Sequence, residues 1–329
     1  MKTADDYVGL SLKKLFIMGD GRLRPEWRLI VVLILELLIT AMLFRVLWDL
    51  TMLSLKVPPG LAPDGRLEFL METIAGDELL GLASQLIPSI ALILAILLAL
   101  RFIDRKSIED IGAGFCARDR KELAFGLGLG ALSMTVIFAV LLASKSITLE
   151  NDLAHPMLSW NLAIGMVVFI FVGLSEELYS RAYSISALSE IYNRWSAAIV
   201  SSVLFSLLHA GNANVSMGGL ANVLLVGILF AYMFLRSGSV WMPVGYHITW
   251  NYFQGYVFGF PVSGAEVEGA YTVAASRNDF LTGGAFGPEG GLLATTAILA
   301  GFYIVWRFTG GGNPWRTREP EVEGDSELL

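Results

Sequence analysis

Ionisable side chains interrupt an apolar stretch near the middle of the sequence. The segment 169–187 begins with residues typical of a membrane helix, and its second half contains Glu176, Glu177 and Arg181. A charged side chain near the centre of a bilayer costs about 2.5–3.5 kcal/mol on insertion scales. Three such groups within two helical turns need partners or a function, and ionisable residues inside a membrane segment are candidates for functional sites.

Two further polar motifs lie in later apolar stretches. Phe205 and His209 are four residues apart, and His247 and Asn251 have the same spacing. Residues four apart share one face of a helix, so each pair is expected to project together, with Phe205 stacked beside His209. The chain contains only three histidines. Because two of them occupy these motifs, we favour one shared function for the set over separate structural roles for each motif.

Helical geometry assigns different parts to the two adjacent acids. Consecutive residues of a helix point about 100° apart, so one of Glu176 and Glu177 is expected to be catalytic and the other supporting. Glu177 and Arg181 have the spacing of an ion pair within one helix. Each motif alone also has a structural interpretation, either as an ion-pair cluster or as hydrogen bonds between membrane helices.

Composition places these motifs in a polytopic membrane protein. Of the 329 residues, 55% are hydrophobic and only 16% are charged, a profile that excludes an ordinary soluble domain. A membrane helix needs roughly 20 apolar residues. The candidate spans are 27–48, 79–102, 123–144, 160–188, 195–212, 217–235, 239–260 and 289–308. We therefore predict an all-α polytopic membrane protein with about eight transmembrane helices.

The distribution of Lys and Arg predicts the orientation of these spans. If all eight form, most basic residues fall on the side that holds both termini. The opposite side has only Lys56, Arg66, Lys145 and Arg277. By the positive-inside rule, both termini are predicted to be cytoplasmic.

The predicted spans and their orientation divide the chain into three parts. A cytoplasmic or interfacial segment covers 1–26, a membrane domain covers 27–308, and an acidic cytoplasmic tail covers 309–329. Within the membrane domain the catalytic core is expected at about 160–260. The glycine-rich end of the external loop 261–287 is interpreted as turns before the last helix.

Three other features of composition bound the function. Gly126, Gly128 and Gly130 put small residues in the third span, which predicts close approach of another helix. The single cysteine, Cys116, excludes an intrachain disulfide. The net charge is −7, and no basic patch indicates a nucleic-acid partner.

Taken together, the motifs EExxxR, FxxxH and HxxxN, in this order on separate membrane helices, resemble the CPBP family. That family includes type II CAAX prenyl endopeptidases and bacterial abortive-infection or bacteriocin-immunity relatives. The resemblance covers about residues 160–260, and the segments RPEWRL and GPEGG are similar to those of bacterial members. It implies an eight-helix intramembrane endopeptidase in a bacterial plasma membrane.

The resemblance also implies a role for each motif position. Glu176 would activate a water molecule as general base, assisted by His209. His247 and Asn251 would donate hydrogen bonds to the tetrahedral intermediate. The second acid of the motif, Glu177, and the arginine would support the helix and its charge balance.

A metal-dependent version uses the same side chains. Two histidines and a carboxylate form an accepted zinc set with a position left for water, and here they would be Glu176, His209 and His247. The sequence has no HExxH helix, so its spacing gives no direct support for zinc. We favour the metal-independent glutamate mechanism and leave Zn²⁺ open.

The sequence thus predicts an endopeptidase that cleaves a peptide or a lipidated protein at the bilayer. Two other classes of function remain. A proton-coupled transporter would use the carboxylates as a relay, although no internal duplication is visible. A non-catalytic membrane scaffold or immunity protein would not need the four predicted catalytic side chains together, so their joint presence argues against it.

Overall fold

A computed structural model describes residues 14–54, 63–276 and 278–310 of the chain. The long helices are α2 (Pro25–Ser54), α4 (Glu78–Leu98), α5 (Ala117–Ala143), α6 (Asn161–Glu177), α8 (Arg194–Leu208), α9 (Met217–Ser237), α10 (Trp241–Tyr252) and α12 (Leu292–Phe308). The shorter elements are α3 (Pro63–Gly76), α7 (Ser184–Leu188), α11 (Asp279–Thr282), β1 (Ile147–Leu149) and β2 (Val273–Ser276). The two strands pair antiparallel, and the other regular elements of the described residues are helices.

Three helices continue into π-helical segments. These segments are Ala99–Asp104 after α4, Leu178–Tyr183 after α6 and Phe253–Val257 after α10. The second one joins α6 to α7, so that a single helical stretch runs from Asn161 to Leu188. π-Helical turns within α-helices frequently mark functional sites.

The helices fit the predicted membrane spans only in part. Within the described residues, five helices are long and apolar enough to cross a membrane. They are Pro25–Leu53, Glu78–Asp104, Ala117–Ala143, Asn161–Leu188 and Met217–Ser237. This confirms an all-α membrane protein. The other three predicted spans contain α8, α10 and α12, which have 15, 12 and 17 residues, so the number eight stays a prediction. The acidic tail lies outside the described residues from 311 onward.

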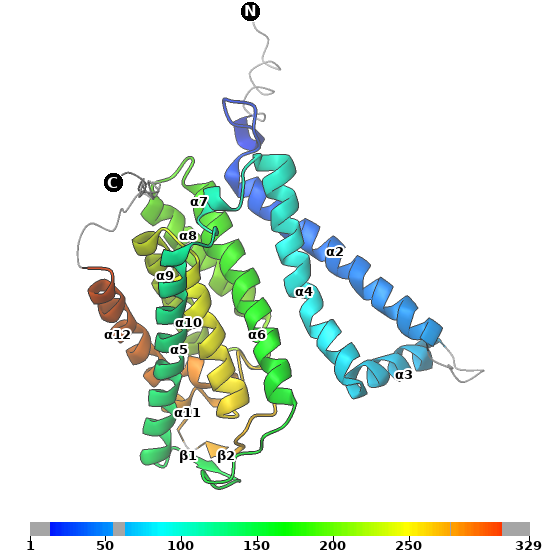
Figure 1. The fold of residues 1–329 in the computed structure, drawn as a ribbon, viewed down its shortest axis with the longest axis vertical. Coiled ribbons are helices and arrows are strands. Elements are labelled where there is room, and N and C mark those ends of the chain that lie inside the picture. The colour runs from blue at the N-terminus through cyan, green and yellow to red at the C-terminus, as the bar shows by residue number, and fades with distance from the viewer. Residues whose placement is uncertain (1–13, 55–62, 277, 311–329) are drawn as a thin grey trace, which may run out of the picture.

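The long helices form a bundle with an arm on one side (Figure 1). Helix α10 packs against α5, α6 and α9, and α8 packs against α9. The arm consists of α2, α3 and α4, and α4 contacts α6. In Figure 1 the arm meets the bundle near the start of α2 and diverges from it toward α3.

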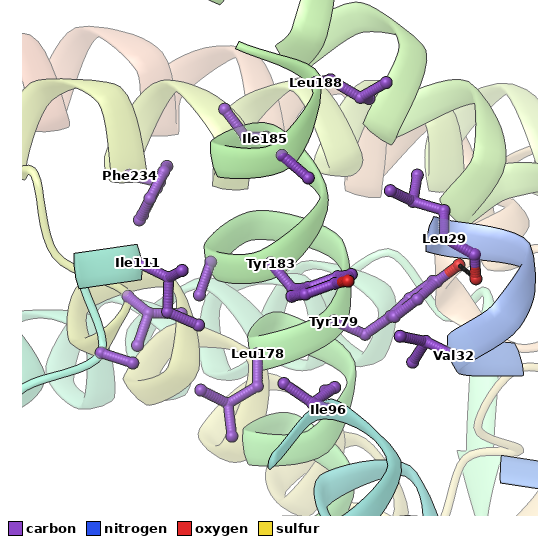
Figure 2. Close-up of a cluster of buried hydrophobic side chains, with 14 of the residues drawn as sticks. Leu29, Val32, Ile96, Ile111, Leu178, Tyr179, Tyr183, Ile185, Leu188 and Phe234 are labelled. Carbon is purple, nitrogen blue, oxygen red and sulfur yellow. Dashed lines mark hydrogen bonds between the residues drawn. The ribbon is translucent and has the colours of Figure 1, made fainter. Parts of the chain in front are cut away.

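An apolar cluster joins the arm to the helical stretch that follows α6 (Figure 2). Tyr179 and Tyr183 come from the π-helical segment and lie beside Leu29 and Val32 of α2, with Ile96 of α4 close by. The Tyr179 hydroxyl donates a hydrogen bond of 3.2 Å to the Leu29 carbonyl. The arm therefore packs directly against the turns that follow Glu176 and Glu177.

A buried ionic network strengthens the same junction. Arg28 is fully buried and pairs with Asp104 at 2.7 Å and with Glu190 at 3.0 Å. Lys106 contacts Glu190 at 2.7 Å, and the Tyr183 hydroxyl donates to Asp104 at 2.8 Å. Burial opposes ionisation of Glu190, but the hydrogen bonds from Arg28 and Lys106 outweigh it and hold its pKa below the usual value. The network ties α2 and the end of the α4 helix to the turn after α7.

Two glycines allow α5 and α10 to cross closely. A side-chain carbon at Gly126 would collide with the Met242 carbonyl oxygen, and one at Gly130 would collide with the Tyr246 carbonyl oxygen. Nothing lies within 4 Å of such an atom at Gly128. Close approach is therefore confirmed for Gly126 and Gly130, and the expectation was wrong for Gly128, which lies on another face of α5.

This difference predicts opposite results for two small substitutions. We expect Gly126→Ala to lower the unfolding temperature in detergent, because α10 must move away from the new methyl group. Gly128→Ala should leave that temperature unchanged or raise it, since alanine is more favourable than glycine in a helix by about 1 kcal/mol. Thermal unfolding of both variants checks the prediction, and equal effects of the two substitutions would contradict it.

Candidate active site

The side chain of Glu176 lies in the middle of the helical stretch formed by α6 and α7. That stretch continues to Leu188, twelve residues beyond Glu176, so the carboxylate is roughly 18 Å from its end at 1.5 Å per residue. The site is thus positioned well inside the bundle.

Helix α8 brings a histidine to the same depth. The Asn193 side chain accepts a hydrogen bond of 2.9 Å from the Ser196 amide and caps the start of α8. The helix then runs 15 residues, roughly 22 Å, and His209 follows its last residue. His209 Nε2 lies 4.0 Å from Glu176 Oε2. The two side chains meet because α8 begins only at Arg194 while the helix of Glu176 continues to Leu188.

A second histidine approaches the same carboxylate oxygen from α10. His247 Nε2 lies 3.9 Å from Glu176 Oε2, and His247 Nδ1 lies 3.0 Å from Glu177 Oε1. A carboxylate oxygen only accepts, so Nδ1 of His247 donates to Glu177. The contact links the two adjacent acids through one imidazole ring.

The other imidazole is oriented in the same way. His209 Nδ1 lies 2.8 Å from the Phe205 carbonyl oxygen, which also only accepts, so this nitrogen carries a proton. In the neutral form of either ring, the remaining nitrogen is an acceptor. Both Nε2 atoms face the same oxygen of Glu176, where a neutral ring presents an acceptor and an imidazolium presents a donor.

The second acid and the arginine form a fully buried pair. Arg181 Nε lies 3.1 Å from Glu177 Oε2, and neither side chain is exposed. The guanidinium carbon lies 4.4 Å from the centre of the Phe205 ring and 5.4 Å from that of Phe230. Among the described residues the guanidinium N–H groups have no hydrogen-bond partner. Charge attraction and aromatic ring faces hold the cation in place.

Glu176 and both histidines open into one cavity of about 420 Å³. Asn251 lines it one turn beyond His247 on α10, together with Glu176, His209 and Phe205. Most of the wall is apolar, and it receives side chains from α2, α4, α6, α8, α9, α10 and α12. The four predicted catalytic side chains and Phe205 thus surround a single space that the arm helps to close, whereas Glu177 and Arg181 lie behind its wall.

The three side chains suggested for zinc do not fit that metal as they are placed. Ligands about 2.1 Å from a tetrahedral zinc lie roughly 3.4 Å apart, whereas each imidazole nitrogen is 3.9–4.0 Å from the carboxylate oxygen. In the part of the chain that the structure describes, no three His, Cys, Asp or Glu side chains are grouped so as to hold a metal ion. We derive no step of the reaction through a metal.

Sequence reasoning missed a further carboxylate that lines the cavity. Glu289 is 9% exposed, and its Oε2 accepts hydrogen bonds of 2.9 Å from both the amide and the hydroxyl of Ser263. Asn222 of α9 donates to the Glu289 carbonyl at 2.7 Å and to the Gly291 carbonyl at 3.0 Å. All three of Asn222, Ser263 and Glu289 line the cavity.

Glu289 was missed because it lies in the glycine-rich stretch that precedes α12. The sequence predicts turns for this stretch, and the structure has turns there, but these turns enter the bundle. Phe286 is 1% exposed and packs in a cluster with Phe205 and Val223. Gly287 has a φ of 101°, which only glycine adopts readily. The positive φ turns the chain back so that Glu289 reaches the cavity, and the density of glycines was the available signal.

Comparisons with known proteins agree with the motifs. Residues 158–253 match the family model of the Type II CAAX prenyl endopeptidase Rce1-like proteins. The chain is also 25% identical over 192 residues to the Bacillus subtilis (strain 168) protein "Putative membrane peptidase YdiL", a match that covers 51% of this chain and 68% of that protein. Every predicted motif residue lies within 158–253. The resemblance to the CPBP family of membrane proteases is therefore confirmed.

Proposed function

We propose that this member of the CPBP family of membrane proteases is an intramembrane endopeptidase that uses Glu176 to activate water. Its substrate would be a peptide or a lipidated protein associated with the bilayer, as for a CAAX protease. The observation that carries the proposal is the convergence of two imidazole Nε2 atoms, at 4.0 and 3.9 Å, on one oxygen of Glu176 inside an apolar cavity.

The geometry leaves room for the attacking water. A water molecule about 2.8 Å from Glu176 Oε2 also reaches the Nε2 atom of His209 or His247, because both nitrogens are within 4.0 Å of that oxygen. Its oxygen attacks the carbonyl carbon of the scissile peptide bond while one of its protons passes to Glu176. His209 accepts a hydrogen bond from the water and orients it.

The same site has groups for the later steps. The imidazolium form of His247, paired with Glu177 through Nδ1, donates its Nε2–H to the developing oxyanion, and Asn251 donates from its amide. When the intermediate collapses, the carbon–nitrogen bond breaks and the proton held by Glu176 passes to the leaving amine. Arg181 pairs with Glu177 and keeps its carboxylate oriented toward His247.

The membrane arrangement completes the proposal. The eight spans would place both termini in the cytoplasm of a bacterial cell, with 27–308 as the membrane domain and 1–26 and 309–329 flanking it. The basic residues flanking these spans support the orientation, and the bacterial relative supports the host membrane. The transporter and scaffold alternatives gain no support from either match.

The proposal is tested with purified protein in liposomes and quenched-fluorescence peptides, one series prenylated and one resembling signal peptides. We expect the wild-type protein to cleave at least one series, with cleavage sites identified by mass spectrometry. Cleavage should persist in the presence of a strong zinc chelator, because the reaction uses a carboxylate base. Absence of cleavage in both series would contradict the endopeptidase function, and full inhibition by the chelator would contradict the metal-independent chemistry.

A further inference from the structure

Glu289 is a buried carboxylate whose side-chain hydrogen bonds, within the described residues, all come from one neighbour. Both of its hydrogen bonds come from Ser263 and fall on the same oxygen, Oε2. No Lys or Arg among the described residues forms a salt bridge with it. A carboxylate inside the membrane normally pairs with an opposite charge or marks the path of a substrate or ion, so this group calls for a cationic partner that no Lys or Arg among the described residues supplies.

The other ionisable side chains that line the cavity form no salt bridge with Glu289 among the described residues. The described residues that line it include three carboxylates, those of Glu36, Glu176 and Glu289, but neither Lys nor Arg. The basic side chains present are His209 and His247. Nδ1 of His209 lies within hydrogen-bond distance of the Phe205 carbonyl oxygen, and Nδ1 of His247 within that of Glu177. The Nε2 atom of each ring lies within 4.0 Å of Glu176. Acidic side chains therefore outnumber basic ones in the cavity lining, and the cavity favours binding of a positively charged group from a ligand or substrate.

The backbone around Glu289 holds its side chain in one place. Asn222 binds the carbonyl oxygens of Glu289 and Gly291, and the Asn222 side-chain oxygen accepts from Thr295 at 2.7 Å. Ser263 binds the carboxylate through two donors. A site whose members are fixed before the ligand binds loses little entropy on binding. This rigidity suits recognition more than it suits a group that must move during the reaction.

We propose that Glu289 is the specificity determinant of the active-site cavity and binds the side chain of a Lys or Arg residue close to the scissile bond. The substrate class would then be membrane-associated peptides with a basic residue near the cleavage site. The inference rests on the proposed endopeptidase function. An ammonium or guanidinium group that enters this cavity loses hydration, and pairing with the already buried Glu289 offsets part of that cost. A neutral side chain at the same position gains no such contact.

The test uses fluorogenic peptides anchored in liposomes, all with one apolar host sequence. One series carries a single Lys at each position on either side of the scissile bond, and the matched series carries norleucine, which has similar length and no charge. We expect wild-type protein to prefer Lys at one position by about 10- to 100-fold in kcat/KM. Glu289→Gln, which keeps an oxygen for Ser263, should remove that preference and leave cleavage of the norleucine series within about threefold. Glu266→Gln, an exposed acid in the same loop, should retain the preference.

Each other outcome overturns the proposal in a recognisable way. Equal cleavage of the two series by the wild-type protein contradicts recognition by Glu289 and leaves the endopeptidase function intact. A loss in Glu289→Gln that is equal for Lys and norleucine peptides indicates a structural carboxyl group instead. Cleavage of no peptide by the wild-type protein rejects the endopeptidase function, and the recognition proposal with it. The comparison of the two series in wild-type protein requires no variant, so it does not depend on the folding of Glu289→Gln.

Discussion

Glu176→Gln is expected to reduce kcat/KM for peptide cleavage by about 10²–10⁴-fold, the usual contribution of a general base. Glutamine has the same size and still accepts a hydrogen bond, but it cannot take a proton from water. The Glu176 side chain is 32% exposed and has no cationic partner closer than the two imidazoles, so its charge contributes little to folding. The unfolding temperature should therefore stay near that of the wild-type protein. Single-turnover cleavage in liposomes and thermal unfolding in detergent measure the two quantities.

Glu150→Gln provides the matched control for this experiment. Glu150 is an exposed acid outside the cavity, and its substitution makes the same chemical change, so activity should be unaffected. If Glu176→Gln retains more than about a tenth of wild-type activity while it folds normally, the base must be another group. The adjacent acid would not then be the obvious replacement, because Glu177 is already bound to both Arg181 and His247.

The part of the site that sequence predicted well is the part set by spacing along one helix. Four-residue spacing placed Phe205 beside His209, and their ring centres are 4.6 Å apart. It also paired Glu177 with Arg181. Apolar stretches located the helices, because lipid requires a hydrophobic surface on each of them. The predicted spans 160–188 and 195–212 lie close to the helical stretch that ends at Leu188 and to helix α8, which begins at Arg194.

The contacts that sequence did not predict depend on how helices rotate against one another. The hydrogen bond from His247 to Glu177 joins α10 to α6, and neither motif contains information about the facing helix. The crossing of α5 and α10 at Gly126 and Gly130 sets that rotation, since close contact at these glycines leaves little freedom. A pattern of small residues indicates which helix is approached closely, but the partner emerges only from the packing.

Glu289 was missed for a different physical reason. Turn-forming residues are normally taken as surface loops because backbone polar groups need water or hydrogen bonds. Here the bundle supplies these bonds, for example from the Asn222 side chain to two carbonyl groups. An irregular segment is tolerated at membrane depth when it is buried in protein or lines a cavity, and both conditions apply to this segment.

Substitution of Glu177 is expected to have the largest effect on stability. Glu177→Ala leaves the Arg181 cation buried without its carboxylate and removes the acceptor for His247 Nδ1. Breaking one side of a buried ion pair typically costs 3–5 kcal/mol, and Arg181 and Glu177 are both fully buried here. We expect a marked fall in the free energy of unfolding in mixed micelles, together with loss of peptide cleavage. Arg181→Met should destabilise the protein to a similar extent, because it leaves the Glu177 charge without its main partner.

The double substitution Glu177→Gln with Arg181→Met separates the two functions of this pair. It removes both buried charges, and the glutamine oxygen can still accept from His247 Nδ1. The double variant should be more stable than Arg181→Met alone, which appears as a coupling energy in a double-mutant cycle. Cleavage should remain low, because the imidazolium of His247 loses the carboxylate that stabilises it beside the oxyanion. Additive losses of stability would show that the pair is not coupled, and recovery of cleavage along with stability would show that Glu177 acts only as a structural counterion.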